Sequence, residues 1–120
     1  THPLHTIRAA IAAATPAGAA PVELLAVSKT RSADEVRALA ALGQRAYGEN
    51  YVQEGVAKIR ELAGLGLEWH LIGPLQSNKC REVAEHFDWI ESVDRAKLVE
   101  PLARYRPPGK PPLKVLVQVK

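Results

Sequence analysis

A lysine follows a short apolar run near the start of the sequence. The run LLAV, residues 24–27, stops at Ser28 and Lys29. A lysine that is buried among apolar groups has a lowered pKa, and its neutral amine can attack a carbonyl and form a Schiff base. A lysine that merely ends a strand and reaches solvent has no such chemistry. The pattern therefore leaves two interpretations of Lys29 open, a nucleophilic amine and a solvated strand end.

Two further polar residues occupy comparable places in later segments. Side chains alternate between the two faces of a strand, so Asn50 shares a face with the small residues at 46 and 48, and His70 shares a face with Ile72. The small residues leave room beside Asn50. The pattern is compatible with a cavity at the strand ends that contains Lys29, Asn50 and His70.

Each of these polar residues also has a purely structural interpretation. Asn50 comes immediately before a predicted helix, with Gln53 three residues later, which is typical of a helix N-cap. His70 is compatible with a hydrogen-bonded core histidine. Cys80 is expected to be a small buried residue, because no neighbour marks it as activated.

Several other kinds of chemistry have no support in the sequence. Neither a GxxxxGK[ST] phosphate loop nor a GxGxxG motif is present, and His2 and His5 have no further ligands nearby, so no metal site is expected. The formal charge of +3 is too small to predict nucleic-acid binding. No apolar run has the length of a membrane span. One cysteine excludes an internal disulfide and fits a cytoplasmic protein.

The elements that must position these residues alternate between helices and strands. An Ala-rich segment, 4–14, predicts a first helix, and Ser32 with Glu35 matches a capping box for the second, which Gly43 ends. Further helices are predicted at 51–63, 78–87 and 94–104, the last capped by Asp94. The predicted strands are 22–28, 45–50, 68–73, 89–93 and 113–120.

This alternation predicts an α/β fold with a parallel sheet covered by helices. Both an open doubly wound sheet and a (β/α) barrel fit, and both place functional residues at the C-terminal ends of strands. A closed barrel typically needs about 250 residues. Five strands in 120 residues therefore favour part of a larger domain, or an open sheet with an unpaired edge.

Longer motifs are more specific than this pattern. The segments LLAVSKT (24–30), YGENYVQE (47–54) and WHLIGPLQSNK (69–79) together resemble the pyridoxal phosphate homeostasis protein family. The segments FDWIESVDR (87–95) and LKVLVQVK (113–120) fit the same family in order and spacing. The resemblance covers essentially the whole chain, residues 2 to 120.

The resemblance implies a fold like the N-terminal barrel of alanine racemase, a (β/α)8 TIM barrel preceded by an extra helix. Residues 1–120 would form the N-terminal part of this single domain, an incomplete barrel of about five strands. The resemblance further implies that pyridoxal 5′-phosphate (PLP) is bound as an internal aldimine on Lys29. Asn50, His70 and Ile72 are implied to line the cofactor pocket. The family keeps PLP bound and helps to control vitamin B6 pools, without an established catalytic turnover.

The same resemblance leaves alternatives open. A racemase-like enzyme needs a second base, for which only Tyr47, Tyr51 and Tyr105 could be considered. The groups that bind the PLP phosphate in the family come from later segments, so these 120 residues could also be a fragment without saturable PLP binding. The strand 113–120 would then have an exposed edge, which predicts self-association through it.

Overall fold

The computed structural model describes residues 3–20 and 22–119. Helices and strands alternate along the chain after a first helix, as the sequence predicts. The helices are α1 (Pro3–Ala14), α2 (Ala33–Ala41), α3 (Val52–Glu61), α4 (Cys80–His86) and α5 (Val99–Tyr105). The strands are β1 (Ala26–Val27), β2 (Ala46–Glu49), β3 (Glu68–Leu71), β4 (Trp89–Val93) and β5 (Lys114–Val117).

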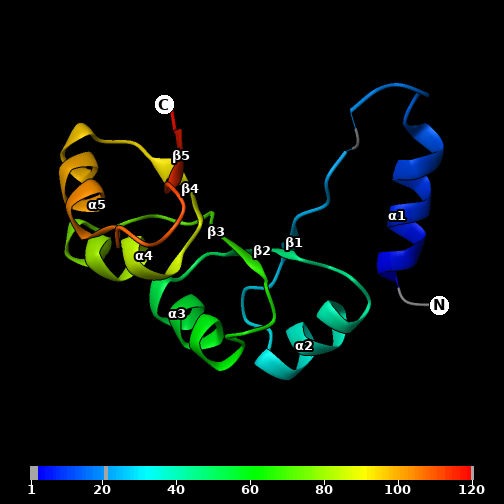
Figure 1. Ribbon diagram of the computed structural model, residues 1–120, viewed down its shortest axis with the longest axis horizontal. Helices are drawn as coiled ribbons and strands as arrows, with labels where there is room; N and C mark the ends of the chain where they lie inside the picture. The colour runs from blue at the N-terminus through cyan, green and yellow to red at the C-terminus, as the bar shows by residue number, and fades with distance from the viewer. Residues whose placement is uncertain (1–2, 21, 120) are drawn as a thin grey trace.

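The five strands form one parallel sheet in the order β1-β2-β3-β4-β5, so every strand pairs with its neighbour in sequence. Figure 1 shows α2, α3, α4 and α5 following one another in an arc along one side of this sheet, whereas α1 stands apart. The sheet is not closed, because within the described residues β1 pairs only with β2 and β5 only with β4. The predicted fold class, an incomplete (β/α) barrel, is therefore confirmed.

The core lies between the sheet and the arc of helices. Alternate strand residues point into it, and those that are completely or almost completely buried include Tyr47, Trp69, Leu71 and Ile90. Helices α2 to α5 supply the opposing apolar side chains, among them Val36, Val56, Val83 and Leu102. The other face of the sheet carries the residues between these positions, and it includes the predicted site.

The first strand differs from its prediction. We expected residues 22–28 to form a strand within an apolar run, but β1 spans only Ala26–Val27, and Val27 is 54% exposed. The physical reason is that β1 is an edge strand with a single partner, and its inner face has no layer packed on it in the described part of the chain. A continuous apolar run cannot distinguish such a strand from one in a complete barrel.

The helix ends agree with the sequence in some places and differ in others. Ser32 and Glu35 form the predicted capping box, and Gly43 follows α2 with a φ of 97°. Short 3-10 turns, Ser77–Lys79 and Ala96–Leu98, precede α4 and α5, and the residue that caps the second turn is Arg95 rather than the predicted Asp94. His2 and Lys120 lie outside the described residues.

Candidate functional site

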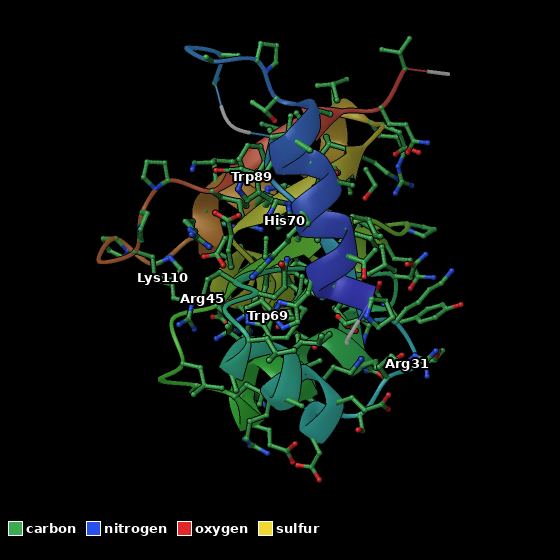
Figure 2. The ribbon with its side chains drawn as sticks, turned by 90° about the vertical axis from the view of Figure 1, so that its right-hand side faces the viewer. Arg31, Arg45, Trp69, His70, Trp89 and Lys110 are labelled. Atoms are coloured by element: carbon green, nitrogen blue, oxygen red, sulfur yellow. The ribbon has the colours of Figure 1, made fainter. Side chains whose placement is uncertain are left out.

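The C-terminal ends of the parallel strands lie on one side of the molecule, and Lys29 follows the end of β1 there. Figure 2 shows Arg31, two residues after Lys29, on the opposite side from Arg45, which precedes β2. Lys29 lies in the turn that follows β1. It is exposed, and among the described residues its amine has neither a hydrogen bond nor an ion pair.

A tight turn presents this lysine. The amide of Arg31 donates to the carbonyl oxygen of Ser28 at 3.1 Å, which closes the turn around Lys29 and Thr30. Thr30 has a φ of 59°, in the left-handed region that a β-branched residue rarely adopts. Such strain persists only where surrounding contacts hold the backbone in place.

Ile72 and Asn50 lie on the inner face of the neighbouring strands. The amide of Ile72 donates to the carbonyl oxygen of Glu49 at 2.9 Å, which extends the ladder between β2 and β3 to this level. A Cβ atom at Gly48 would lie 3.1 Å from Cδ1 of Ile72 and 3.5 Å from Cδ2 of Leu25. Glycine at this position therefore leaves room for the apolar side chains of Ile72, which follows β3, and of Leu25, which precedes β1.

Asn50 is not the cap of α3. The N-cap residue is Tyr51, and it makes no side-chain capping bond. The Oδ1 atom of Asn50 is buried and has no hydrogen-bond partner among the described residues. A buried polar atom without a partner costs free energy, so it marks a place where a ligand or another segment can supply a donor.

His70 lies one layer further from the strand ends than Lys29. Its backbone is in register with Gly48, which is in register with Val27, two residues before Lys29. Two carboxylates contact the ring nitrogens: Glu91 at 2.6 Å from Nδ1 and Glu68 at 2.9 Å from Nε2.

The His70 ring is also covered by an aromatic side chain. It stacks on Trp89 with the ring centroids 5.3 Å apart and the planes 6° from parallel. Figure 2 shows the two residues close together in the middle of the molecule. These contacts agree with the structural interpretation of a hydrogen-bonded core histidine.

An ionic cluster behind β1 was missed by the sequence analysis. Lys58 of α3 contacts Glu49 at 3.0 Å, and both side chains are buried, 7% and 0% exposed. The hydroxyl of Ser28 donates to the same carboxylate. The spacing of Glu54 and Lys58, four residues apart on one helix, was visible in the sequence, but it is equally typical of a solvated helix surface.

Open depressions lie at both ends of the strands. One of about 310 Å³ is at the C-terminal side, lined by Asn50, Tyr51, Val52, Gln53, Pro74, Gln76 and Lys79. A larger one of about 830 Å³ lies between α1 and the N-terminal ends of the strands, and none of the four predicted site residues lines it. Size alone therefore does not identify the site, because the buried unpaired oxygen of Asn50 belongs to a residue that lines the smaller depression.

Known proteins resemble this chain closely. The pyridoxal phosphate homeostasis protein of Escherichia coli is 55% identical over 124 residues, which cover 98% of this chain and 53% of that protein. The protein of the same name from Haemophilus influenzae is 57% identical over 100 residues, 82% of this chain and 42% of the relative. The chain is similar to these proteins along most of its own length. It spans about half the length of these curated relatives, and no protein-family model matches it.

Solved structures agree with the fold. PipY of Synechococcus elongatus, with PLP bound, is 50% identical and superimposes with a TM-score of 0.70 over 81% of this chain and 45% of its own. An unknown protein from Bifidobacterium adolescentis is 38% identical, with a TM-score of 0.69 over 84% of this chain and 47% of its own. In the part of the chain that the structure describes, no helix combines the length and apolarity that a bilayer crossing demands.

Proposed function

We propose that this chain binds PLP through the amine of Lys29 and serves in the intracellular homeostasis of PLP. The observation that carries the proposal is the amine of Lys29, which is exposed in the turn after β1 and has no partner among the described residues. The names of the curated relatives and the PLP in PipY support the same assignment. PLP supplies an aldehyde, which a lysine amine can join as a carbon–nitrogen double bond with loss of water.

The residues around Lys29 fit such a ligand. The carboxamide of Asn50 has a buried oxygen without a partner, so it can accept a hydrogen bond from a polar group of the bound molecule. Ile72 offers an apolar surface on the same face, and Gly48 beside it adds no side chain. His70 lies two residues before Ile72 and on the same face of the sheet. Its ring is fixed there by its contacts with Glu91 and Glu68.

The contacts to the phosphate of PLP are expected from outside this chain. The family resemblance assigns them to later segments, and the chain spans about half of its relatives' length. We therefore infer that residues 1–120 form one part of a single barrel domain, which supplies the amine and one wall of the pocket.

We infer further that the protein does not turn over a substrate. A racemase-like enzyme needs a second base at the cofactor, and two of the three tyrosines are engaged elsewhere. Tyr47 is completely buried on the helix side and donates to the carbonyl oxygen of Gln44 at 3.0 Å. The Tyr105 ring lies against the guanidinium groups of Arg104 and Arg81. Tyr51 is exposed at the start of α3, so the test of this inference uses its substitution.

The binding experiment is a PLP titration of the purified protein, followed by borohydride reduction and peptide mass mapping. The expected result is a saturable absorbance change, with the reduced adduct on Lys29. Lys29→Met should abolish the adduct, whereas Lys97→Met, which removes an exposed lysine from the turn before α5, should leave it intact. An adduct scattered over surface lysines, or none, overturns the proposal and favours a fragment with an incomplete site.

The catalytic alternative has its own measurement. L-Alanine is incubated with the PLP-loaded protein and its optical rotation is followed over time. We expect no loss of rotation. A loss that Tyr51→Phe abolishes would instead establish a racemase-like enzyme.

A further inference from the structure

We propose that Lys58, Glu49 and Glu54 are positioning residues that hold the turn carrying Lys29 and keep Lys29, rather than Lys58, available to a carbonyl ligand. The proposal rests on the proposed function, since it gives these residues a role in presenting the PLP-binding amine. None of the three side chains needs to touch the ligand. They act through the backbone on either side of Lys29.

The backbone before Lys29 is bound by the first part of this cluster. Nζ of Lys58 donates to the carbonyl oxygen of Ser28 at 2.5 Å. The Ser28 hydroxyl donates to the carboxylate of Glu49, which is completely buried at the end of β2. Ser28 is therefore fixed through both its main chain and its side chain, on the helix-covered side of the sheet.

The backbone after Lys29 is bound by the second part. The amide of Thr30 donates to Oε1 of Glu54 at 2.6 Å. The same carboxylate oxygen accepts from Lys58 at 3.0 Å, so one helix, α3, contacts the turn on both sides of Lys29. This contact falls on the residue with the left-handed backbone, where an external hold is required to maintain the strained conformation.

The cluster also makes Lys58 less available for reaction than Lys29. The ammonium of Lys58 donates to Ser28, to Glu49 and to Glu54, so its three N–H groups all have acceptors. It is buried and cannot approach a carbonyl without breaking these bonds. The amine of Lys29 is exposed and has no such partner among the described residues. A carbonyl ligand can therefore react with Lys29 more readily than with Lys58.

A purely stabilising role explains the cluster poorly. Buried ion pairs are often replaced by apolar residues without loss of stability, because removing the charges from water costs as much as their attraction returns. Apolar residues could not donate to the Ser28 carbonyl or accept from the Thr30 amide. Polar side chains are therefore needed at the positions where the cluster hydrogen-bonds to the turn.

The test compares Glu54→Ala, Glu54→Gln and the control Glu85→Gln in the purified protein. Glu54 is partly exposed on α3, so alanine there keeps the helix. Glutamine retains an oxygen that can accept from Thr30. Glu85 pairs with Arg81 at the same spacing of four residues, but on the exposed surface of α4. Urea midpoints establish that each variant is folded.

Two readouts are taken. The first is the hydrogen-exchange rate of the Thr30 amide in protein without PLP. The second is the rate at which borohydride-trapped adduct forms on Lys29. For Glu54→Ala we expect the amide to exchange about tenfold faster and the adduct to form about tenfold more slowly, as for the loss of one hydrogen bond to a charged group. Glu54→Gln should recover most of both rates, and Glu85→Gln should match the unmodified protein.

The outcomes separate this proposal from the function on which it rests. If the unmodified protein forms no adduct on Lys29, the proposed function fails, while the Thr30 exchange rate still decides whether the cluster holds the turn. An unchanged exchange rate in Glu54→Ala overturns the positioning proposal. So does faster exchange with an unchanged rate at Lys29, because the cluster would then order the turn without serving the amine. An adduct on Lys58 would contradict the proposed separation of the two lysines.

Discussion

The backbone of Gly73 lies directly against the backbone of Asn50. A Cβ atom at position 73 would lie 2.0 Å from the carbonyl oxygen of Asn50, a separation that no real contact allows. The two residues follow β3 and β2, so this contact sets how closely the two strand ends approach at the candidate site.

We expect Gly73→Ala to lower the free energy of unfolding by about 2 kcal/mol or more, because backbone on both sides must move. Urea unfolding measures the loss. Gly109→Ala is the matched control, since a Cβ there meets nothing within 4 Å and the expected change is small. Equal effects of the two substitutions would mean that the contact with Asn50 is not a constraint.

Removing one partner of the buried pair of Lys58 and Glu49 should lower the free energy of unfolding more than Gly73→Ala does. Lys58→Met leaves the carboxylate buried without its counter-ion, which costs about 3–5 kcal/mol of unfolding free energy. The double variant with Glu49→Leu should recover much of this loss, because neither charge then remains in the interior. Denaturant unfolding of both single variants and of the double variant gives the coupling energy.

An exposed ion pair provides the comparison. Arg37 contacts Asp34 at 2.7 Å on the surface of α2, where both side chains are largely in water. Arg37→Met should cost about 1 kcal/mol or less. If Lys58→Met costs no more than this control, burial of the pair has no energetic consequence and the prediction is wrong.

The capping box of α2 predicts a specific pH dependence. The amide of Ser32 donates to Glu35, and this bond, followed by that of the Ser32 hydroxyl, lowers the pKa of the Glu35 carboxyl. A lowered pKa in the folded state stabilises the fold above the ordinary pKa of glutamate. That stabilisation is lost as the pH falls through the lowered value.

An NMR titration of the Glu35 side chain checks this pH dependence. Its midpoint should lie below the ordinary value in the unmodified protein. Ser32→Ala removes the hydroxyl and weakens the N-cap, so it should move the midpoint upward and cost about 1 kcal/mol of stability. Ser77→Ala should leave the midpoint unchanged. A midpoint at or above the ordinary value of glutamate in the unmodified protein would contradict the assigned cause.

Cys80 is predicted to be an inert thiol. It is buried at the start of α4, and burial raises the pKa of its thiol, with Arg95 opposing the shift only in part. The folded state therefore holds the thiol proton more tightly, and this contribution to stability decreases as the pH rises above the ordinary thiol pKa. A thiol-specific dye should react with Cys80 only after unfolding in urea. Rapid stoichiometric reaction of the folded protein would contradict the prediction.

The outer edge of β5 predicts association of this chain with itself. Within the described residues β5 pairs only with β4, and Val115, Leu116 and Val117 are exposed. Apolar strands with an unpaired edge favour pairing with another chain. Sedimentation at increasing concentration should show a dimer that Leu116→Lys weakens. A monomer at all concentrations would exclude pairing through this edge.

Much of the fold could be predicted because periodicity and capping are local properties of the sequence. The capping box at Ser32, the end of α2 at Gly43 and the alternation of strands and helices depend on residues a few positions apart. The burial of Cys80 also agreed with its prediction. The extent of β1 could not be predicted, because it depends on which strands lie beside it rather than on its own residues.

The candidate site was predictable only in part. Sequence alternation grouped Asn50 with the small residues at 46 and 48 and was compatible with a cavity that contains Lys29. It could not show that the Asn50 oxygen has no partner or that Tyr51 is the N-cap of α3. The cluster behind the turn joins three elements, so no sequence window contains it. Glu49 alternates with residues of the inner face, and only the position of α3 brings Lys58 to it.

The order of the strands has a consequence for synthesis of the protein. Among the described residues each strand after β1 pairs with the strand that immediately precedes it in the chain, so none of these pairings waits for a distant segment. Short loops between contacting elements favour rapid folding, and a chain on the ribosome emerges from its N-terminus. The sheet can therefore grow one strand at a time as translation proceeds, and the turn of Lys29 acquires its contacts to α3 well before β5 is made.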